Sequence, residues 1–235
     1  GEDLLVGSPA NISGGENNAG QAYLFDSSGN ELRTYDNPDP VQGGFFGFSV
    51  AAVGSDQLLV GAPRNNVTRG DGQVFIEAGQ VYLFEKGDSQ PLQTYNNPNP
   101  QAAFVSQGTF VGAVPIADTN FGASVATVNN NRFLVGAPGH TVTTADDDFP
   151  RAGQAFLIDR GGTTVQTYDN PNPSLAGVNK GQGNAFGISV AAIGSNQGLF
   201  GASGNDSNIG QAFVYSLGDS NPSSAIAIDN PQADG

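Results

Sequence analysis

The residues best suited to recognise a ligand lie in two long segments, Arg64–Glu77 and Gly139–Arg151. Arg69-Gly70-Asp71 presents a cation and a carboxylate on either side of a glycine, although in a chain of this composition the tripeptide also arises by chance. Asp146-Asp147-Asp148 offers the oxygen ligands that calcium takes. The alternative is a solvated charge run, since three adjacent side chains do not converge readily. His140, the only histidine, lies near this run without a partner at metal-ligand or catalytic spacing.

Catalytic chemistry finds little support in the sequence. The chain has one histidine and no cysteine, and it lacks both a Gly-x-Ser-x-Gly elbow and a phosphate-binding loop that leads into a helix. Paired carboxylates for glycoside hydrolysis are the alternative, because aspartates are plentiful, but no Asp or Glu is distinguished by its surroundings. We therefore expect a protein that is not an enzyme.

The composition argues against several classes of partner and site. The formal net charge of −14 argues against nucleic acid and against docking on anionic lipid, since both are bound through clustered Lys and Arg. The absence of cysteine excludes disulfides and zinc-thiolate sites, and the absence of methionine as well is compatible with a location outside the cell. The sequence shows no signal peptide and no transmembrane run, so we expect no membrane insertion and a processed or excised portion of a longer protein.

Four sequence markers recur in the same order and define the elements that must carry the candidate residues. They are Phe-Gly opening an alternating run (Phe46–Ala51, Phe121–Ala126, Phe186–Ala191), an apolar run ending in Gly-Ala-Pro or a variant (Leu4–Pro9, Leu58–Pro63, Phe133–Pro138, Gly198–Ser203), Gly-Gln before an aromatic run (Gly20–Phe25, Gly79–Phe84, Gly153–Ile158, Gly210–Tyr215), and a run closing in Asn-Pro (Thr34–Pro38, Thr94–Pro98, Thr167–Pro171, Ala227–Pro231). The Asn-Pro prolines are 60, 73 and 60 residues apart, so a single insertion explains the longer middle spacing.

Each marker predicts one short strand, and strands joined by Gly, Asn and Asp turns form antiparallel meanders. A four-stranded sheet that repeats about every 60 residues is typical of a propeller blade. We therefore predict an all-β fold, a β-propeller of four-stranded antiparallel blades, as a single propeller or propeller segment over 1–235. The repeats span approximately 1–40, 41–100, 101–173 and 174–235.

The glycines that recur within the markers are explained by what the backbone requires at those positions. The glycines of Phe-Gly and Gly-Ala-Pro are expected where neighbouring backbones approach closely or where φ must be positive. Proline after Gly-Ala suits a strand end, and Asx-Asn-Pro suits an extended exit into a turn.

These motifs resemble the FG-GAP repeat of integrin α-chains. Phe-Gly-x-Ser-Val-Ala is followed by Val-Gly-Ala-Pro and then by Gly-x-Val-Tyr-Leu-Phe, and the resemblance covers essentially the whole chain. It implies a β-propeller that recognises ligands outside the cell, as a secreted or surface protein. In that context Arg69-Gly70-Asp71 is also the tripeptide that integrins recognise.

The chain departs from this family at the calcium loops. Many members carry Asp-x-Asp/Asn-x-Asp-Gly between the first and second strands, whereas the matching segments here are 54–57, 129–132 and 194–197, which contain one carboxylate among them. Calcium needs six to eight oxygen ligands, so these segments predict tight turns. We expect no cofactor, with weak calcium binding elsewhere as the remaining alternative.

A second departure is the first repeat, which lacks its Phe-Gly strand. Three explanations stay open: a fragment of a longer array, a four-bladed ring with one irregular blade, or a strand donated by a neighbouring chain.

Loop lengths indicate where a partner binds. The connections between second and third strands vary widely, as do those from one repeat to the next, and in an up-and-down blade both sets emerge on one face. The leading hypothesis is a recognition or adhesion module that binds an extracellular protein or glycan through this face. The alternative is a structural unit of a filament or surface layer, in which copies of the chain assemble by strand complementation.

Overall fold

The computed structural model describes residues 3–101, 119–145, 147–173, 183–205, 209–218 and 225–231. Every element bounded among these residues is a strand, and the strands form several antiparallel sheets. The predicted all-β class is therefore confirmed.

Four larger sheets follow one another along the chain, and within each the strands pair in chain order. Sheet 1 has three strands, β1 (Leu4–Ser8), β2 (Gln21–Phe25) and β3 (Glu31–Asp36). The other sheets have four strands each: β4 (Ser49–Val53), β5 (Gln57–Ala62), β8 (Gln80–Glu85) and β9 (Gln93–Asn96) in sheet 2; β10 (Ser124–Asn129), β11 (Arg132–Ala137), β14 (Gln154–Asp159) and β15 (Thr164–Asp169) in sheet 3; β16 (Phe186–Ile193), β17 (Gln197–Ala202), β18 (Gln211–Ser216) and β19 (Ile226–Asp229) in sheet 4.

Two small hairpins interrupt this pattern. They pair β6 (Val67–Thr68) with β7 (Val74–Phe75), and β12 (Val142–Thr143) with β13 (Asp148–Phe149). Each lies in the connection between the second and third strands of its sheet, in sheets 2 and 3 respectively. The sequence markers did not predict these hairpins.

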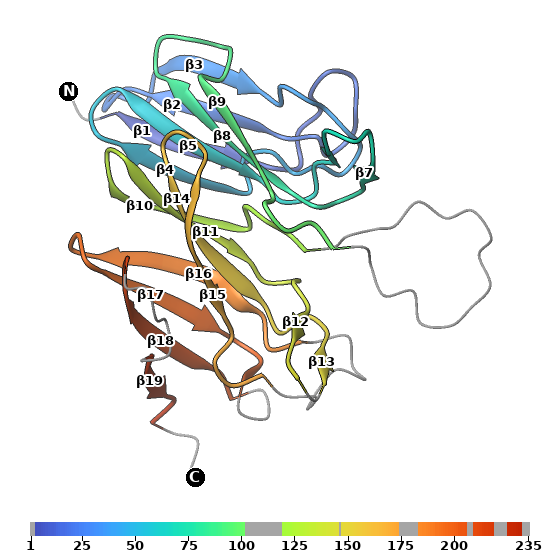
Figure 1. Ribbon diagram of the computed structural model, residues 1–235. Coiled ribbons are helices and arrows are strands. Elements are labelled where there is room, and N and C mark those ends of the chain that lie inside the picture. The colour runs from blue at the N-terminus through green and yellow to red at the C-terminus, as the bar shows by residue number, and fades with distance from the viewer. Residues whose placement is uncertain are drawn as a thin grey trace.

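The four sheets pack one after another in chain order. The first strand of each sheet lies beside that of its neighbour, since β1 contacts β4, β4 contacts β10, and β10 contacts β16. Figure 1 shows sheet 1 (blue) and sheet 4 (orange to red) at opposite ends of this array. Within the described residues the array is thus open.

The described residues form three large hydrophobic clusters, one between each pair of neighbouring sheets, and a small one under the β6–β7 hairpin. In β5, Leu58 and Val60 belong to the cluster shared with sheet 1, and Leu59 belongs to the cluster shared with sheet 3. Because side chains alternate along a strand, a sheet buried on both faces needs a continuous apolar run. This requirement explains the apolar residues that precede Gly-Ala-Pro.

The Phe-Gly marker joins one sheet to the next. Each Phe is fully buried, and its N–H donates to the carbonyl oxygen of the residue before Gly-Gln in the preceding sheet: Phe46 to Ala19 at 2.9 Å, Phe121 to Ala78 at 3.4 Å and Phe186 to Ala152 at 3.0 Å. The following glycines have φ of +85°, +93° and +84° at Gly47, Gly122 and Gly187. A side chain at these left-handed positions would be strained, so the expectation of positive φ is confirmed.

The glycine of Gly-Ala-Pro allows the backbones of two sheets to meet. A Cβ added to Gly61 would overlap the carbonyl oxygen of Gly122 in the next sheet, and one added to Gly136 would overlap that of Gly187. We call the contact between two neighbouring sheets, made by the Phe-Gly and Gly-Ala-Pro markers, a joint. Serines of the Phe-Gly strands add a hydrogen bond to it: Ser49 Oγ donates to Gly122 O at 2.7 Å and Ser124 Oγ donates to Gly187 O at 2.8 Å. The expected close approach of backbones is confirmed at these sites.

The last two markers are linked by side-chain hydrogen bonds within each sheet. The Gln of Gly-Gln donates through Nε2 to the Asx of Asx-Asn-Pro in all four sheets: Gln21 to Asp36 at 2.7 Å, Gln80 to Asn96 at 2.8 Å, Gln154 to Asp169 at 2.5 Å and Gln211 to Asp229 at 2.6 Å. These bonds tie together the last two strands of each sheet, at the end where the first of them begins and the second ends. The markers are therefore structural residues that hold strands and sheets together.

Candidate functional site

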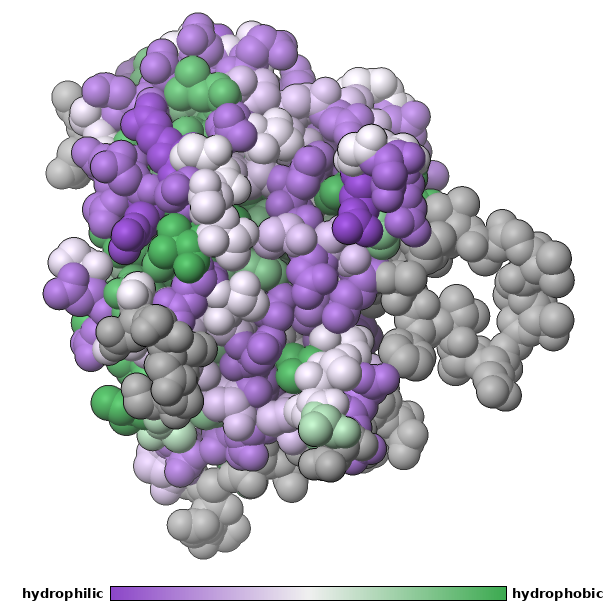
Figure 2. Space-filling view, viewed as in Figure 1, coloured by the Kyte–Doolittle hydropathy of each residue, from purple (hydrophilic) through white to green (hydrophobic). Residues whose placement is uncertain are grey.

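The two small hairpins define the surface with the most elaborate connections. In Figure 1, β7, β12 and β13 lie along one edge of the array, whereas the short turns from first to second strands lie along the other. Figure 2 shows hydrophilic side chains gathered over β7. We call the edge with β6–β7 and β12–β13 the loop face.

Arg69-Gly70-Asp71 forms the exposed tip of the β6–β7 hairpin. Arg69 N donates to Gln73 O at 2.8 Å, and Asp71 Oδ1 accepts from Gln73 N at 3.0 Å, so the tip is a closed turn. The Arg69 guanidinium lies 5.6 Å from the centre of the Phe75 ring, a cation–π contact. Phe75 itself packs with Val67 and Ala78 in a small buried cluster, which anchors the tip.

Two of the three consecutive aspartates lie in the second hairpin. Asp147 and Asp148 are exposed at the start of β13, while Asp146 lies outside the described residues. Asp147 N donates to Thr144 Oγ1 at 3.1 Å, and Thr144 N donates to Asp147 O at 2.9 Å. The structure thus places Asp147 and Asp148 on the loop face, as it does Arg69-Gly70-Asp71, but in a separate hairpin.

His140 does not lie with the other candidate residues. It is 2 % exposed, its Nε2 is 3.4 Å from Asn99 Nδ2, and its buried Nδ1 has no hydrogen-bond partner among the described residues. Burial lowers its pKa to about 4, so the ring is neutral at physiological pH. The geometry makes His140 a residue of the joint between sheets 2 and 3.

Comparison of the repeats explains this position. The residue two places after Pro63 in sheet 2 is Asn65, and His140 takes the matching place after Pro138. Asn65 is fully buried and donates through Nδ2 to Gln80 Oε1 at 3.1 Å and to Tyr82 OH at 2.8 Å. Sequence reasoning treated His140 as a loop residue. The recurring Asn in the other repeats was the signal that would have placed it in a joint.

The described residues line at least two pockets, one at the edge opposite the loop face and one on sheet 4 beside the connection from β17 to β18. One, of about 270 Å³, lies among the short turns, where Asp56, Glu85 and Arg160 are among its lining residues. The other, of about 310 Å³, lies on sheet 4 between Ser189, Gly201 and Ile228. No group of three or more His, Cys, Asp or Glu side chains gathers as a metal site in the part of the chain that the structure describes.

We expect millimolar calcium to leave the unfolding temperature unchanged within about 1 °C, because a ligand stabilises a fold only in proportion to its binding to the native state. The turns at the family's calcium positions are closed by their own side chains: Ser55 Oγ donates to Asp56 Oδ2 at 2.7 Å, and Asn131 N donates to Asn129 Oδ1 at 2.9 Å. Differential scanning calorimetry with calcium and with a chelator measures the shift. A rise of several degrees in calcium would show that the chain holds a cation site.

Comparison with protein-family models gives no match, and comparison with curated proteins finds no similar sequence. The described residues include no helix long and apolar enough to cross a membrane. The resemblance to FG-GAP repeats therefore rests on the sequence motifs of this chain alone.

Proposed function

We propose that the chain is a β-propeller-type array of FG-GAP-like repeats that acts outside the cell as a non-catalytic recognition or adhesion module. Its loop face binds a protein or a glycan. Four sheets in sequence, built from one repeated joint, form a rigid support for connections of different length. Loops on such a support are where recognition residues usually lie.

The observation that carries this proposal is the β6–β7 hairpin. It presents an exposed arginine and an exposed aspartate on one turn, and it fixes the turn by backbone bonds and by the contact of Arg69 with Phe75. A fixed turn loses little conformational entropy on binding, which favours recognition. Arg69 and Asp71 supply the charges that a protein receptor pairs with.

The proposal is tested by adhesion of integrin-bearing cells to surfaces coated with the chain, together with binding of the chain to a panel of immobilised glycans. Asp71→Ala removes the carboxylate from the tip, and we expect it to reduce adhesion by on the order of tenfold, the effect of losing one well-placed charged contact. Asp88→Ala makes the same change of charge at an exposed turn after β8, away from the hairpin, and serves as the control.

Equal adhesion by the two variants would exclude the tripeptide as the recognition element. A glycan bound equally by both variants, and lost in the double variant Asp147→Ala/Asp148→Ala, would move the site to the second hairpin. Absence of binding to cells and to every glycan would count against the recognition function itself.

A second candidate function, a structural unit that assembles with copies of itself, is favoured by one observation. Sheet 1 presents Leu4 and Val6 at 60 % and 37 % exposure, and sheet 4 presents Ile226 and Ile228 at 62 % and 49 %. Apolar faces at both ends of an open array allow head-to-tail contact. Light scattering over a range of protein concentrations tests it, because growth of ordered oligomers supports assembly and a constant monomer mass excludes it.

A further inference from the structure

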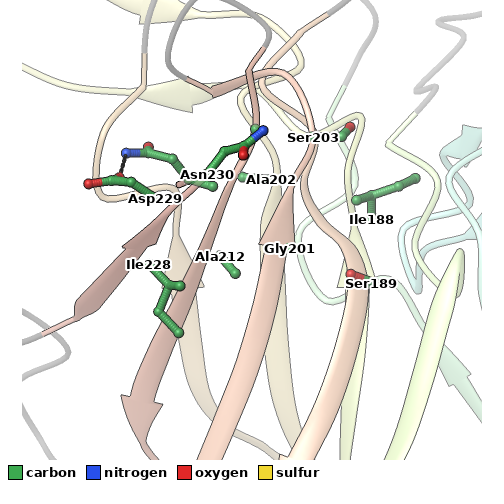
Figure 3. A pocket seen from close by; sticks show the side chains of 11 residues that line it. Ile188, Ser189, Gly201, Ala202, Ser203, Ala212, Ile228, Asp229 and Asn230 are labelled. Atoms are coloured by element: carbon green, nitrogen blue, oxygen red, sulfur yellow. Dashed lines mark hydrogen bonds between the residues drawn. The ribbon is translucent and has the colours of Figure 1, made fainter. Parts of the chain in front are cut away.

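The pocket on sheet 4 lies where a Phe-Gly segment of the next sheet lies on each of sheets 1, 2 and 3. In sheet 3 the matching residues are Ser124, Gly136 and Gly153, and Phe186-Gly187 of sheet 4 lies against them. In sheet 4 their counterparts are Ser189, Gly201 and Gly210, and these line the pocket. Figure 3 shows Ser189, Gly201, Ala212 and Ile228 around this open space.

The two glycines of the pocket keep the features of an occupied joint. Gly210 has a φ of +86°, close to the +90° of Gly79 and of Gly153. A Cβ at Gly79 or Gly153 would overlap the backbone of the Phe that lies against it, whereas the nearest atom to a Cβ at Gly210 is Ser203 O at 3.4 Å. At Gly201 such a Cβ would meet a flexible side chain, Ser189 Oγ, instead of a neighbouring backbone. Glycine in a strand interior weakens the strand unless another backbone approaches it closely.

The polar groups of the joint are also in place. Ser49 and Ser124 donate to the carbonyl of the glycine that enters from the next sheet, and their counterpart Ser189 is exposed and makes no side-chain hydrogen bond to any described residue.

The backbone acceptor of the joint is present as well. Ala19 O accepts from both Asn37 Nδ2 at 3.0 Å and Phe46 N at 2.9 Å. Ile209 O, at the matching position, accepts from Asn230 Nδ2 at 3.5 Å. Because a carbonyl oxygen has two lone pairs, Ile209 O can take a second donor in the same way.

The apolar face beside the pocket is the one that the next sheet covers elsewhere. Tyr95 and Tyr168, in the last strands of sheets 2 and 3, are 4 % and 0 % exposed. Ile228 holds their place in β19 and is 49 % exposed. Covering apolar surface is favourable in water, so an occupant of this face gains binding energy besides that from the pocket.

We infer that the pocket on sheet 4 is a binding site for a polypeptide segment in which Phe-Gly opens a β-strand. The occupant is the Phe-Gly strand of a repeat other than those described in this chain. Phe46, Phe121 and Phe186 are each fully buried in their own joints, so a second copy of the described residues has no free Phe-Gly to offer. The site lies on the end of the array and does not depend on the proposed role of the loop face.

The test uses a fluorescently labelled peptide with the sequence of residues 119–129, which contains Phe121-Gly122 and the strand that follows. We expect saturable binding to the whole chain by fluorescence anisotropy. A control peptide with Gly122→Val should bind at least about tenfold more weakly, because valine disfavours the left-handed conformation that the glycine adopts.

Two variants of the chain locate the site. Gly201→Ala fills the space where the incoming glycine carbonyl would lie, and Ser189→Ala removes its hydrogen-bond donor. Both should weaken peptide binding, the first by about tenfold and the second by several-fold, while Ser195→Ala, at the exposed turn after β16, should not. Ser189 is exposed, so its variant tests the site even if Gly201→Ala lowers stability.

Several outcomes would overturn the inference. Peptide that binds equally to all three variants would occupy another place, such as the free edge of β1. Equal binding by the Gly122→Val peptide would show that binding does not depend on the left-handed conformation of this glycine. Self-association that Gly201→Ala abolishes, without peptide binding, would assign the pocket to a second copy of the chain.

Discussion

Replacing Gly136 with alanine is expected to lower the free energy of unfolding by about 3 kcal/mol, at the upper end of what overpacking costs in a well-packed core. The added Cβ would overlap the carbonyl oxygen of Gly187, which is backbone and is held in place by Ser124 Oγ at 2.8 Å. The overlap can be relieved only by separating sheets 3 and 4. That separation would expose the cluster between them, in which Phe186 and Phe200 are fully buried.

The matched control for this variant is Gly201→Ala. Gly201 holds the same position in sheet 4, but there the added Cβ meets only the exposed side chain of Ser189, which can rotate. We expect a loss below about 1 kcal/mol, because alanine also stiffens the unfolded chain. Urea unfolding followed by circular dichroism measures both variants. Similar losses at the two positions would show that sheet-to-sheet contact is not what requires glycine at Gly136.

The strand order could be predicted from the sequence because the joints repeat. Gly47 and Gly61 are needed for backbone reasons that recur at each joint, so the interval from Gly61 to its counterpart Gly136 gives the length of chain from one sheet to the next. The apolar run Leu58-Leu59-Val60 predicted a strand, and the structure shows that this strand is buried on both faces. Motifs enforced by backbone geometry are visible in a sequence even when overall composition is uninformative.

The hairpins and the buried amides could not be predicted in the same way. The strands β6 and β7 have two residues each, too short for an alternating pattern to be recognised. Their stability comes from packing of Val67 and Phe75, which depends on the tertiary structure. The recurrence of Asn65 after Gly-Ala-Pro could be seen in the sequence, but the contacts of Asn65 and His140 depend on which sheets are neighbours.

The joint between sheets 2 and 3 is the one in which the amide pattern is broken. In sheets 1, 2 and 4 an asparagine donates through Nδ2 to the Gln of Gly-Gln: Asn11 to Gln21 at 3.0 Å, Asn65 to Gln80 at 3.1 Å and Asn205 to Gln211 at 3.1 Å. Sheet 3 has His140 in that place, and within the part of the chain that the structure describes the buried atoms Gln154 Oε1 and His140 Nδ1 have no hydrogen-bond partner. A buried polar atom without a partner costs about 1–3 kcal/mol.

His140→Asn is therefore expected to stabilise the protein, by about 1 kcal/mol at neutral pH, since the amide can donate to Gln154 Oε1 as Asn65 does to Gln80. The gain should grow in acid. The pKa of His140 is lowered from 6.5 to about 4, because burial disfavours the charged ring. A histidine with a depressed pKa contributes stability above its unfolded pKa, and this contribution is lost as pH falls toward the folded value.

Between about pH 7 and pH 5 the free energy of unfolding of the wild-type protein should fall by about 2 kcal/mol through this residue. The reason is that His140 binds a proton in the unfolded chain but not in the folded chain. His140→Asn has no such group, and the carboxylates are common to both proteins, so the difference between the two curves isolates the histidine. Unfolding by urea at several pH values measures it. Parallel curves would mean that His140 is protonated in the folded joint without cost, whereas a gap that widens toward pH 5 would establish a buried neutral histidine that weakens this joint in acid.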